Sequence, residues 1–186
     1  MKRSNESRIF RGSLISLCLS LVLLPLMIYL REIGIYIQFG TPPPFIGHKL
    51  IEYILIVNVV ISLCFIIKSR SLKSIMVLAG VFVLLARSIF YSFPNPLWET
   101  EVTTLVSPDN SFKYIVVETG VGHLYKLSES GLYMTFITTL RTDDGYQPFA
   151  NDAYKIDWLS SEQFVIHYAF DVSSEEMDKE VTISIE

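Results

Sequence analysis

Three long apolar runs fill the first half of this chain and constrain its fold more than any other feature. They cover residues 13–30, 50–67 and 74–91, and each has 18 residues. Because a helix rises about 1.5 Å per residue, each run spans roughly 27 Å, close to the hydrocarbon thickness of a bilayer. No small-x-small cleavage site follows Leu30, so we interpret the first run as an uncleaved anchor. The runs predict three transmembrane helices within residues 1–92, with the lipid bilayer as their surroundings.

Charge divides the chain into two unlike halves. Residues 1–92 hold 10 Lys/Arg and 3 Asp/Glu, whereas residues 93–186 hold 5 and 16, so the net charges are +7 and −11. An acidic half without clustered Lys/Arg is unsuited to a phosphate backbone, which argues against nucleic acid as a partner. Cys18 and Cys64 both lie in predicted spans, so the acidic half has no thiolate for a disulfide or a metal site.

The positions of the basic residues predict the orientation in the membrane. Four Lys/Arg precede the first span, and the link KSRSLK at residues 68–73 carries three more. An even number of crossings separates these two segments, so they share a side, which the positive-inside rule makes cytoplasmic. We therefore expect a multi-pass protein of the cell membrane with a cytoplasmic N-terminus and an extracytoplasmic C-terminal domain.

The loop between the first two spans, residues 31–49, contains aromatic residues and the run Pro42-Pro43-Pro44. Prolines in series favour an extended, polyproline-like backbone, and aromatic side chains suit the headgroup layer. We interpret this loop as an interfacial segment on the outer leaflet. A gating or partner-binding lid is the alternative.

Two charged residues interrupt the second and third apolar runs. Glu52 lies near the start of the second span and Arg87 near the end of the third, so antiparallel helices would place them at similar depth. The simplest interpretation is a solvated Glu52 and an Arg87 that snorkels to the interface. A structural Glu52–Arg87 ion pair is the alternative. Asn58, nearer the middle of its span, can hydrogen-bond between helices, and the few ionisable groups argue against a proton or ion relay.

After a Pro-rich linker at residues 93–97, the pattern changes to the period of two that is typical of half-buried strands. Residues 98–186 therefore predict a small, acidic, antiparallel all-β domain, either a curled sheet or a sandwich. On the longest expected strand, Leu132, Met134, Phe136 and Leu140 should share one face. The pattern predicts a turn at Gly120-Val121-Gly122, and an exposed loop or a single acidic turn at residues 171–180. The expected strands cover residues 102–106, 112–116, 132–140, 154–158, 164–170 and 181–185.

The motifs of common catalytic and metal sites are missing from this sequence. His48, His123 and His167 show no His-x-His or His-x-x-x-His spacing, and no Gly-x-Ser-x-Gly occurs. The acidic residues of TDDGYQPFAND, at residues 142–152, do not follow the spacing of a calcium loop. We predict no catalytic, metal-binding or cofactor-binding residues and no cofactor.

Two motifs of the tail carry a resemblance. Ser107-Pro108-Asp109-Asn110 is followed by the strand FKYIVVE, and KIDWL at residues 155–159 is followed by FVI. This pattern resembles a group of small membrane-anchored proteins of Gram-positive bacteria, whose tails open with an SPDG turn and close with a Trp-containing strand, a turn and a further strand. The resemblance implies an extracytoplasmic β domain and assigns no site residues. Asn110 stands where the group has glycine.

The favoured interpretation is an integral membrane protein that displays a non-catalytic extracytoplasmic β domain. This domain would bind another protein of the membrane or envelope. Two alternatives stay open. One is an enzyme or a transport-complex component, which requires ionisable groups that converge in the fold. The other is a solute-binding sensor domain, which requires a deep apolar pocket.

Overall fold

The computed structural model describes residues 2–38, 45–92, 100–143, 145–172 and 177–185. The chain divides into two compact units, one built of helices and one of strands. The helical unit comprises Met1–Ile33 and Gly47–Pro94, and the strand unit comprises Gly34–Ile46 and Asn95–Glu186.

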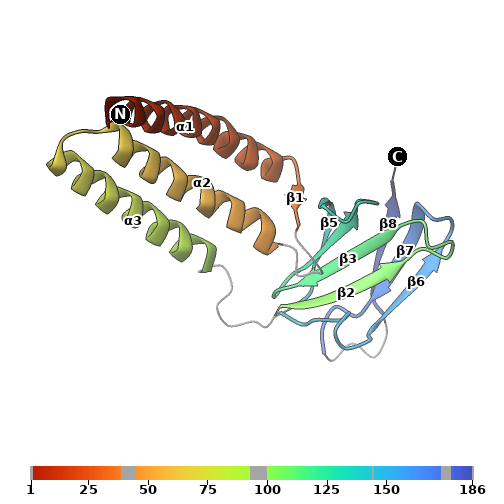
Figure 1. The fold of residues 1–186 in the computed structure, drawn as a ribbon. Helices are drawn as coiled ribbons and strands as arrows, with labels where there is room; N and C mark the ends of the chain where they lie inside the picture. Colours follow the sequence, from red (N-terminus) through yellow and green to blue (C-terminus); the bar gives the residue numbers. More distant parts are fainter. Residues whose placement is uncertain (1, 39–44, 93–99, 144, 173–176, 186) are drawn as a thin grey trace. The chain divides into compact units, whose positions relative to one another are not determined.

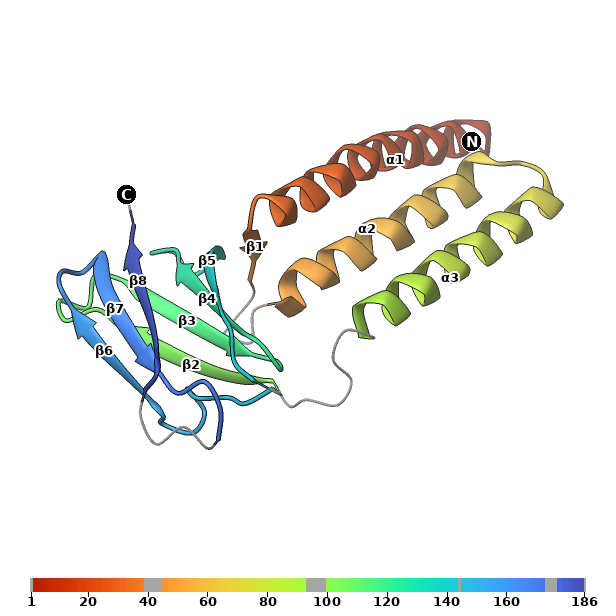
Figure 2. The same cartoon turned by 180° about the vertical axis from the view of Figure 1, so that it is seen from behind.

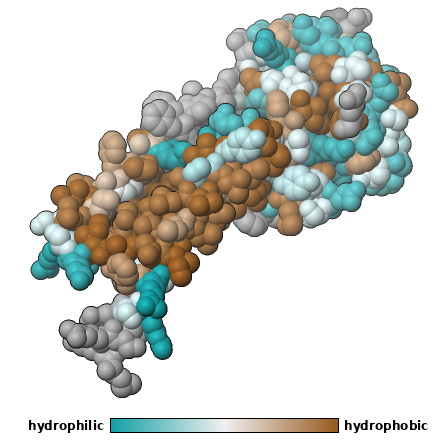
Figure 3. Space-filling view, turned by 90° about the horizontal axis from the view of Figure 1, so that it is seen from above, coloured by the Kyte–Doolittle hydropathy of each residue, from teal (hydrophilic) through white to brown (hydrophobic). Residues whose placement is uncertain are grey.

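Three helices form the first unit, and all three are long and apolar enough to cross a membrane. Their bounds are α1 Lys2–Glu32, α2 Phe45–Ile66 and α3 Arg70–Ser92 (Figure 1). Large apolar side chains such as Leu78 and Phe82, each 71% exposed, cover the outside of the unit, and this apolar surface is continuous along the helices in Figure 3. An apolar exterior of this kind is stable in hydrocarbon and not in water.

Helix α2 is held to both other helices by specific contacts. Toward α1, the Asn58 side-chain amide donates to the hydroxyl oxygens of Ser16, at 2.8 Å, and Ser20, at 2.6 Å, which confirms the expected hydrogen bond between helices. Toward α3, a Cβ added to Gly80 would clash with the Val60 side chain. Gly80 therefore permits a close approach of the two helices, as small residues do in membrane bundles.

A glycine-to-alanine comparison tests this close approach. We expect Gly80→Ala to destabilise the helical unit by about 1–3 kcal/mol, because the β-branched Val60 side chain has little freedom to move away. Gly12→Ala is the matched control, since nothing lies within 4 Å of its added Cβ. Alanine is the better helix former, so the control should be neutral or slightly stabilising. Equal effects of both variants on unfolding in mixed micelles would contradict the packing role of Gly80.

Among the described residues, eight strands form two antiparallel sheets that are not closed into a barrel. The strand order is β1-β5-β4-β3-β2 in the larger sheet and β6-β7-β8 in the smaller one, which lies in front in Figure 2. The bounds are β1 Ile35–Ile37, β2 Glu101–Val106, β3 Lys113–Glu118, β4 Gly122–Leu127, β5 Tyr133–Leu140, β6 Tyr154–Trp158, β7 Gln163–Tyr168 and β8 Lys179–Ser184.

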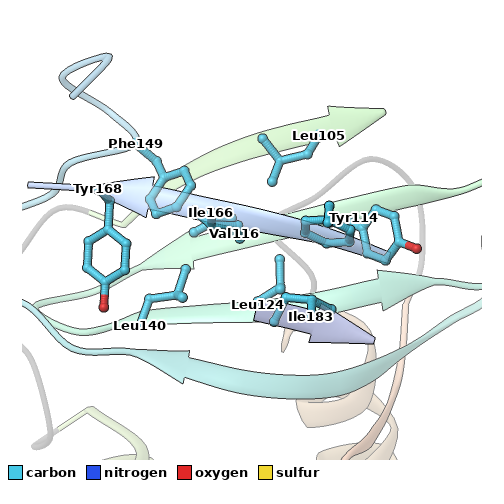
Figure 4. Close-up of a cluster of buried hydrophobic side chains, with 10 residues drawn as sticks. Leu105, Tyr114, Val116, Leu124, Leu140, Phe149, Ile166, Tyr168 and Ile183 are labelled. Atoms are coloured by element: carbon cyan, nitrogen blue, oxygen red, sulfur yellow. The ribbon is translucent and has the colours of Figure 1, made fainter. Parts of the chain in front are cut away.

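One hydrophobic core joins the two sheets (Figure 4). Alternate residues of the larger sheet, such as Tyr114 and Leu124, pack against Phe164 and Ile166 of the smaller sheet, and all four are fully buried. The Phe164 ring lies 4.8 Å from the Tyr114 ring, measured between centroids. The expectation of antiparallel strands around an aromatic core is confirmed.

The larger sheet has a second apolar cluster on its other face. Ile115, Val117, Tyr125 and Met134 are buried there, and Tyr36 of β1 packs edge-on against Tyr125, with 5.6 Å between the ring centroids. The larger sheet is thus apolar on both faces, whereas a sheet with one solvated face alternates between apolar and polar side chains.

The expectation that Met134, Phe136 and Leu140 share one face is wrong. The register between β4 and β5 shifts at Leu124 and Tyr125, and Ile137 is the additional residue of β5. This β-bulge inverts the alternation. Met134 consequently belongs to the second cluster, whereas Leu140 and Ile137 pack in the core between the sheets.

The loop after the first helix contributes a strand to the β unit. Ile35–Ile37 pairs with Tyr133, Met134 and Thr135 of β5, so this part of the loop is an edge strand of the larger sheet and not a separate lid. For the same reason residues 34–46 belong to the strand unit, whereas the sequence-based boundaries placed them in the helical region. The predicted proline stretch at residues 42–44 and the linker at 93–97 lie outside the described residues.

Candidate functional site

Charged side chains of all three helices converge on Glu52. Its carboxylate is 1% exposed, and Arg87 of α3 contacts Glu52 Oε2 through both Nε, at 3.1 Å, and Nη2. From α1, Arg31 Nη1 lies 3.9 Å from Glu52 Oε1. The structure thus brings Glu52 and Arg87 together, and it adds Arg31, which no pattern in the sequence indicates.

His48, one helical turn before Glu52, completes this cluster. Its Nε2 lies 3.5 Å from Glu52 Oε1 and 3.0 Å from the backbone oxygen of Met27. The His48 side chain is 3% exposed, so it is buried among the helices, and its expected position at the membrane interface stays a prediction. A buried carboxylate held by two guanidinium groups and an imidazole ties the ends of three helices together, which is a structural role.

The other two histidines lie on strands of the β unit. His123 is part of β4 and not of a loop as expected, and burial lowers the pKa of its imidazole. His167 Nε2 lies 3.3 Å from Asp157 Oδ2, and its Nδ1 lies 3.8 Å from Glu180 Oε2. No group of three or more His, Cys, Asp or Glu side chains in the described part of the chain is arranged to hold a metal ion.

Glu118 is a buried carboxylate that the sequence analysis missed. It lies at the end of β3 and accepts backbone hydrogen bonds from Phe149, at 3.2 Å, and Ala150, at 2.9 Å. These bonds fix the segment between β5 and β6 to the larger sheet. Burial raises the pKa of the Glu118 carboxyl above its ordinary value of 4.5, against the effect of the two N–H donors.

The raised pKa of Glu118 predicts the sign of a pH effect. Its contribution to stability is fully present below pH 4.5 and is lost as the pH rises through the folded-state pKa. We therefore expect the advantage of the wild type over Glu118→Gln in unfolding free energy to shrink as the pH is raised from 4.5. Denaturation series at several pH values measure this difference, and a wild-type advantage that grows with pH would contradict the assignment.

The turn before β3 has a backbone conformation that suits Asn110. Asn110 N donates to Ser107 O at 2.9 Å, and its φ of 59° lies in the left-handed region that asparagine tolerates. Asp109 accepts hydrogen bonds from Ser107 Oγ and from Ser111 N and Oγ, which lower its pKa to about 2. Asp109 thus has a structural role in the turn.

An open groove of about 430 Å³ lies beside the turn between β4 and β5. Lys126 lies along it, with Nζ 4.0 Å from the centre of the Phe112 ring and 3.6 Å from Glu162 Oε1. Hydroxyl groups of the turn provide further polar atoms. The groove can hold a polar side chain or small molecule; its lining residues are Phe112, Lys126, Leu127, Ser128, Glu129, Ser130, Tyr133 and Thr135.

The edge strands of the two sheets differ in how many charged residues they carry to discourage the addition of another strand. Strand β2 is the outer strand of the larger sheet and has one charged residue, Glu101, among its six. Strands β6 and β8, the edges of the smaller sheet, each carry one basic and one acidic residue, such as Lys155 and Asp157 of β6. Strand β1 has only three residues. Since charged side chains discourage strand addition, β2 is the least protected edge.

Comparisons of this chain with protein families, with curated proteins and with solved structures give no match. The function is therefore inferred from the helices, the strand arrangement and the sites described above.

Proposed function

We propose that this chain is a multi-pass membrane protein whose acidic β domain binds another protein by strand addition at β2. The observation that carries the proposal is the edge of β2, which pairs only with β3 among the described residues and has six residues with a single charge. An incoming strand would satisfy the outward N–H and C=O groups of this edge, and its side chains would alternate between the two faces of the sheet. In this function the domain has no catalytic role.

The charge of the domain suggests the chemistry of the partner. The half from residue 93 onward has a net charge of −11, and Glu101, at the first position of β2, is exposed. Opposite charge speeds association and selects partners. A basic strand on another membrane or envelope protein is therefore the favoured ligand.

Site-specific photocrosslinking in cells tests the binding edge. A photoreactive residue at Val106, which is 40% exposed on β2, should give an adduct with a second protein. Thr104→Lys, at an exposed position of the same strand, should abolish this adduct, because charge on an edge opposes strand addition. The control places the photoreactive residue at exposed Lys155 of β6. Equal adducts from both sites, or an adduct insensitive to Thr104→Lys, would contradict the proposal.

The proposed orientation places the N-terminus in the cytoplasm and the β domain outside the cell membrane, as the basic residues indicate. A single cysteine tests it: Cys18 and Cys64 are changed to serine, and exposed Glu129 to cysteine. A membrane-impermeant maleimide should label Glu129→Cys in intact cells. Labelling only after lysis would contradict this orientation and would place the binding edge in the cytoplasm.

A further inference from the structure

An apolar pocket lies between α1 and α2 at the end of the helical unit that carries the N-terminus. Its volume is about 460 Å³, within the range of about 300–1,000 Å³ that is typical of ligand sites. Ile9 and Phe10 of α1 face Phe65 and Ile66 of α2 across it, and Lys68 lies at its rim.

This pocket lies where a membrane boundary would be. The apolar run of α1 begins at Ser13 and α2 ends at Ile66. Ile9 and Phe10 therefore lie about one helical turn before that run, and Phe65 and Ile66 are the last residues of α2. Phe65 is 60% exposed and Ile9 is 49% exposed. Open apolar surface at this depth suits an acyl chain, and the neighbouring rim lies at the level of the headgroup phosphates.

Positive charge is concentrated at the same end of the unit. Residues 1–12 and 67–74 together hold seven Lys/Arg and one acidic residue. The side chains of Arg8, Arg11, Lys68 and Arg70 are exposed. The hydrophilic groups at the end of the otherwise apolar helices in Figure 3 belong to this region.

We propose that this pocket binds an anionic phospholipid of the surrounding leaflet, with an acyl chain between α1 and α2 and the phosphate at Lys68. Apolar lining alone would accept any lipid, whereas a basic rim selects an anionic headgroup, as basic pockets between membrane helices do. The inference rests on the membrane-spanning position of the helices in the proposed function, and it does not depend on the edge of β2.

Lipid binding to the full chain in nanodiscs tests the proposal. The probe is phosphatidylglycerol mixed with phosphatidylcholine, and native mass spectrometry of the released protein counts the bound lipid. We expect preferential retention of phosphatidylglycerol. Lys68→Gln should weaken this retention roughly fivefold, whereas Lys73→Gln, with the same change of charge outside the pocket lining, should have a much smaller effect.

A second pair of variants tests the apolar part of the pocket. Ile9→Trp should fill the pocket and reduce retained phosphatidylglycerol, whereas Ile15→Trp, at a 70% exposed position outside the lining, should not. Soluble glycerol phosphate should not compete, because it lacks the acyl chain. Equal losses from Lys68→Gln and Lys73→Gln, competition by glycerol phosphate, or no preference over phosphatidylcholine would overturn the lipid site.

Carbonate extraction of cell membranes tests separately whether the helices span a membrane. It therefore distinguishes failure of the lipid site from failure of the membrane-spanning position on which that site rests. Retention in the membrane pellet together with any of the overturning results removes only the lipid site. Release into the supernatant shows that the helices do not span a membrane, and both the lipid site and the membrane part of the proposed function then fall.

Discussion

Glu52→Ala is expected to destabilise the helical unit by about 3–5 kcal/mol, because removal of one partner leaves buried or half-buried positive charge without its counterion. Both Arg87 and Arg31 contact the Glu52 carboxylate, and His48 lies beside it. Reversible unfolding in mixed micelles measures the loss.

Glu32→Ala is the matched control, since the Glu32 side chain is 70% exposed. Its ion pair with Arg31, at 3.7 Å, is on the surface, and a surface ion pair contributes about 0–1 kcal/mol to stability. A double-mutant cycle with Arg87→Ala then gives the coupling energy between Glu52 and Arg87. Equal losses from Glu52→Ala and Glu32→Ala would contradict the structural role of the charged cluster.

Phe164→Ala is the second change with a large expected effect, about 3–5 kcal/mol on the β unit. The Phe164 side chain is fully buried, and its ring lies 4.8 Å from that of Tyr114 and 4.5 Å from that of Trp158. Truncation would leave a cavity between the two sheets. Near-UV circular dichroism during chemical denaturation reports the loss of this aromatic packing.

The control for this prediction is Leu159→Ala, next to Trp158 in the chain but 65% exposed. Its effect should stay within about 0.5 kcal/mol. If Phe164→Ala were as mild as Leu159→Ala, the two sheets would not share the core described above, and the β unit would be a single curled sheet with a loosely attached second layer.

The helices and most strands could be predicted because their patterns are local. An apolar run of 18 residues indicates a membrane helix whatever its neighbours are. Alternating residues indicate a strand in the same way, and six of the seven strands after residue 100 were expected. These predictions needed no knowledge of which segments meet.

The missed features depend on contacts between distant segments. Strand β4 is not predicted, because Gly122 suggests a turn. In the structure the turn is made by Thr119–Val121, and Gly122 lies in a strand against Leu140. A Cβ at Gly122 would approach Leu140 Cβ to 3.1 Å, so this glycine reflects strand packing. The bulge at Ile137 has no local signal such as glycine, and β1 becomes a strand only by pairing with β5.

The charged cluster shows the same limit. The sequence could suggest a pair of Glu52 and Arg87, because antiparallel spans bring their ends together. It could not add Arg31 or His48, since the rotation of α1 and α2 about their own axes decides which side chains point inward. Glu118 was missed for a related reason: its partners are backbone N–H groups more than 30 residues away, which no residue type reveals.

Because β1 pairs with β5, completion of the larger sheet depends on how the helices between these two strands insert into a membrane. Helices α2 and α3 lie between these strands in the chain. If both helices cross a membrane, the two crossings return the chain to the compartment that already contains β1. If either helix failed to cross, β1 and β5 would be on opposite sides and the larger sheet would lose its edge strand. A chain in which only one of the two helices crosses would therefore lack the five-stranded sheet, and the edge of β5 would be without its β1 partner.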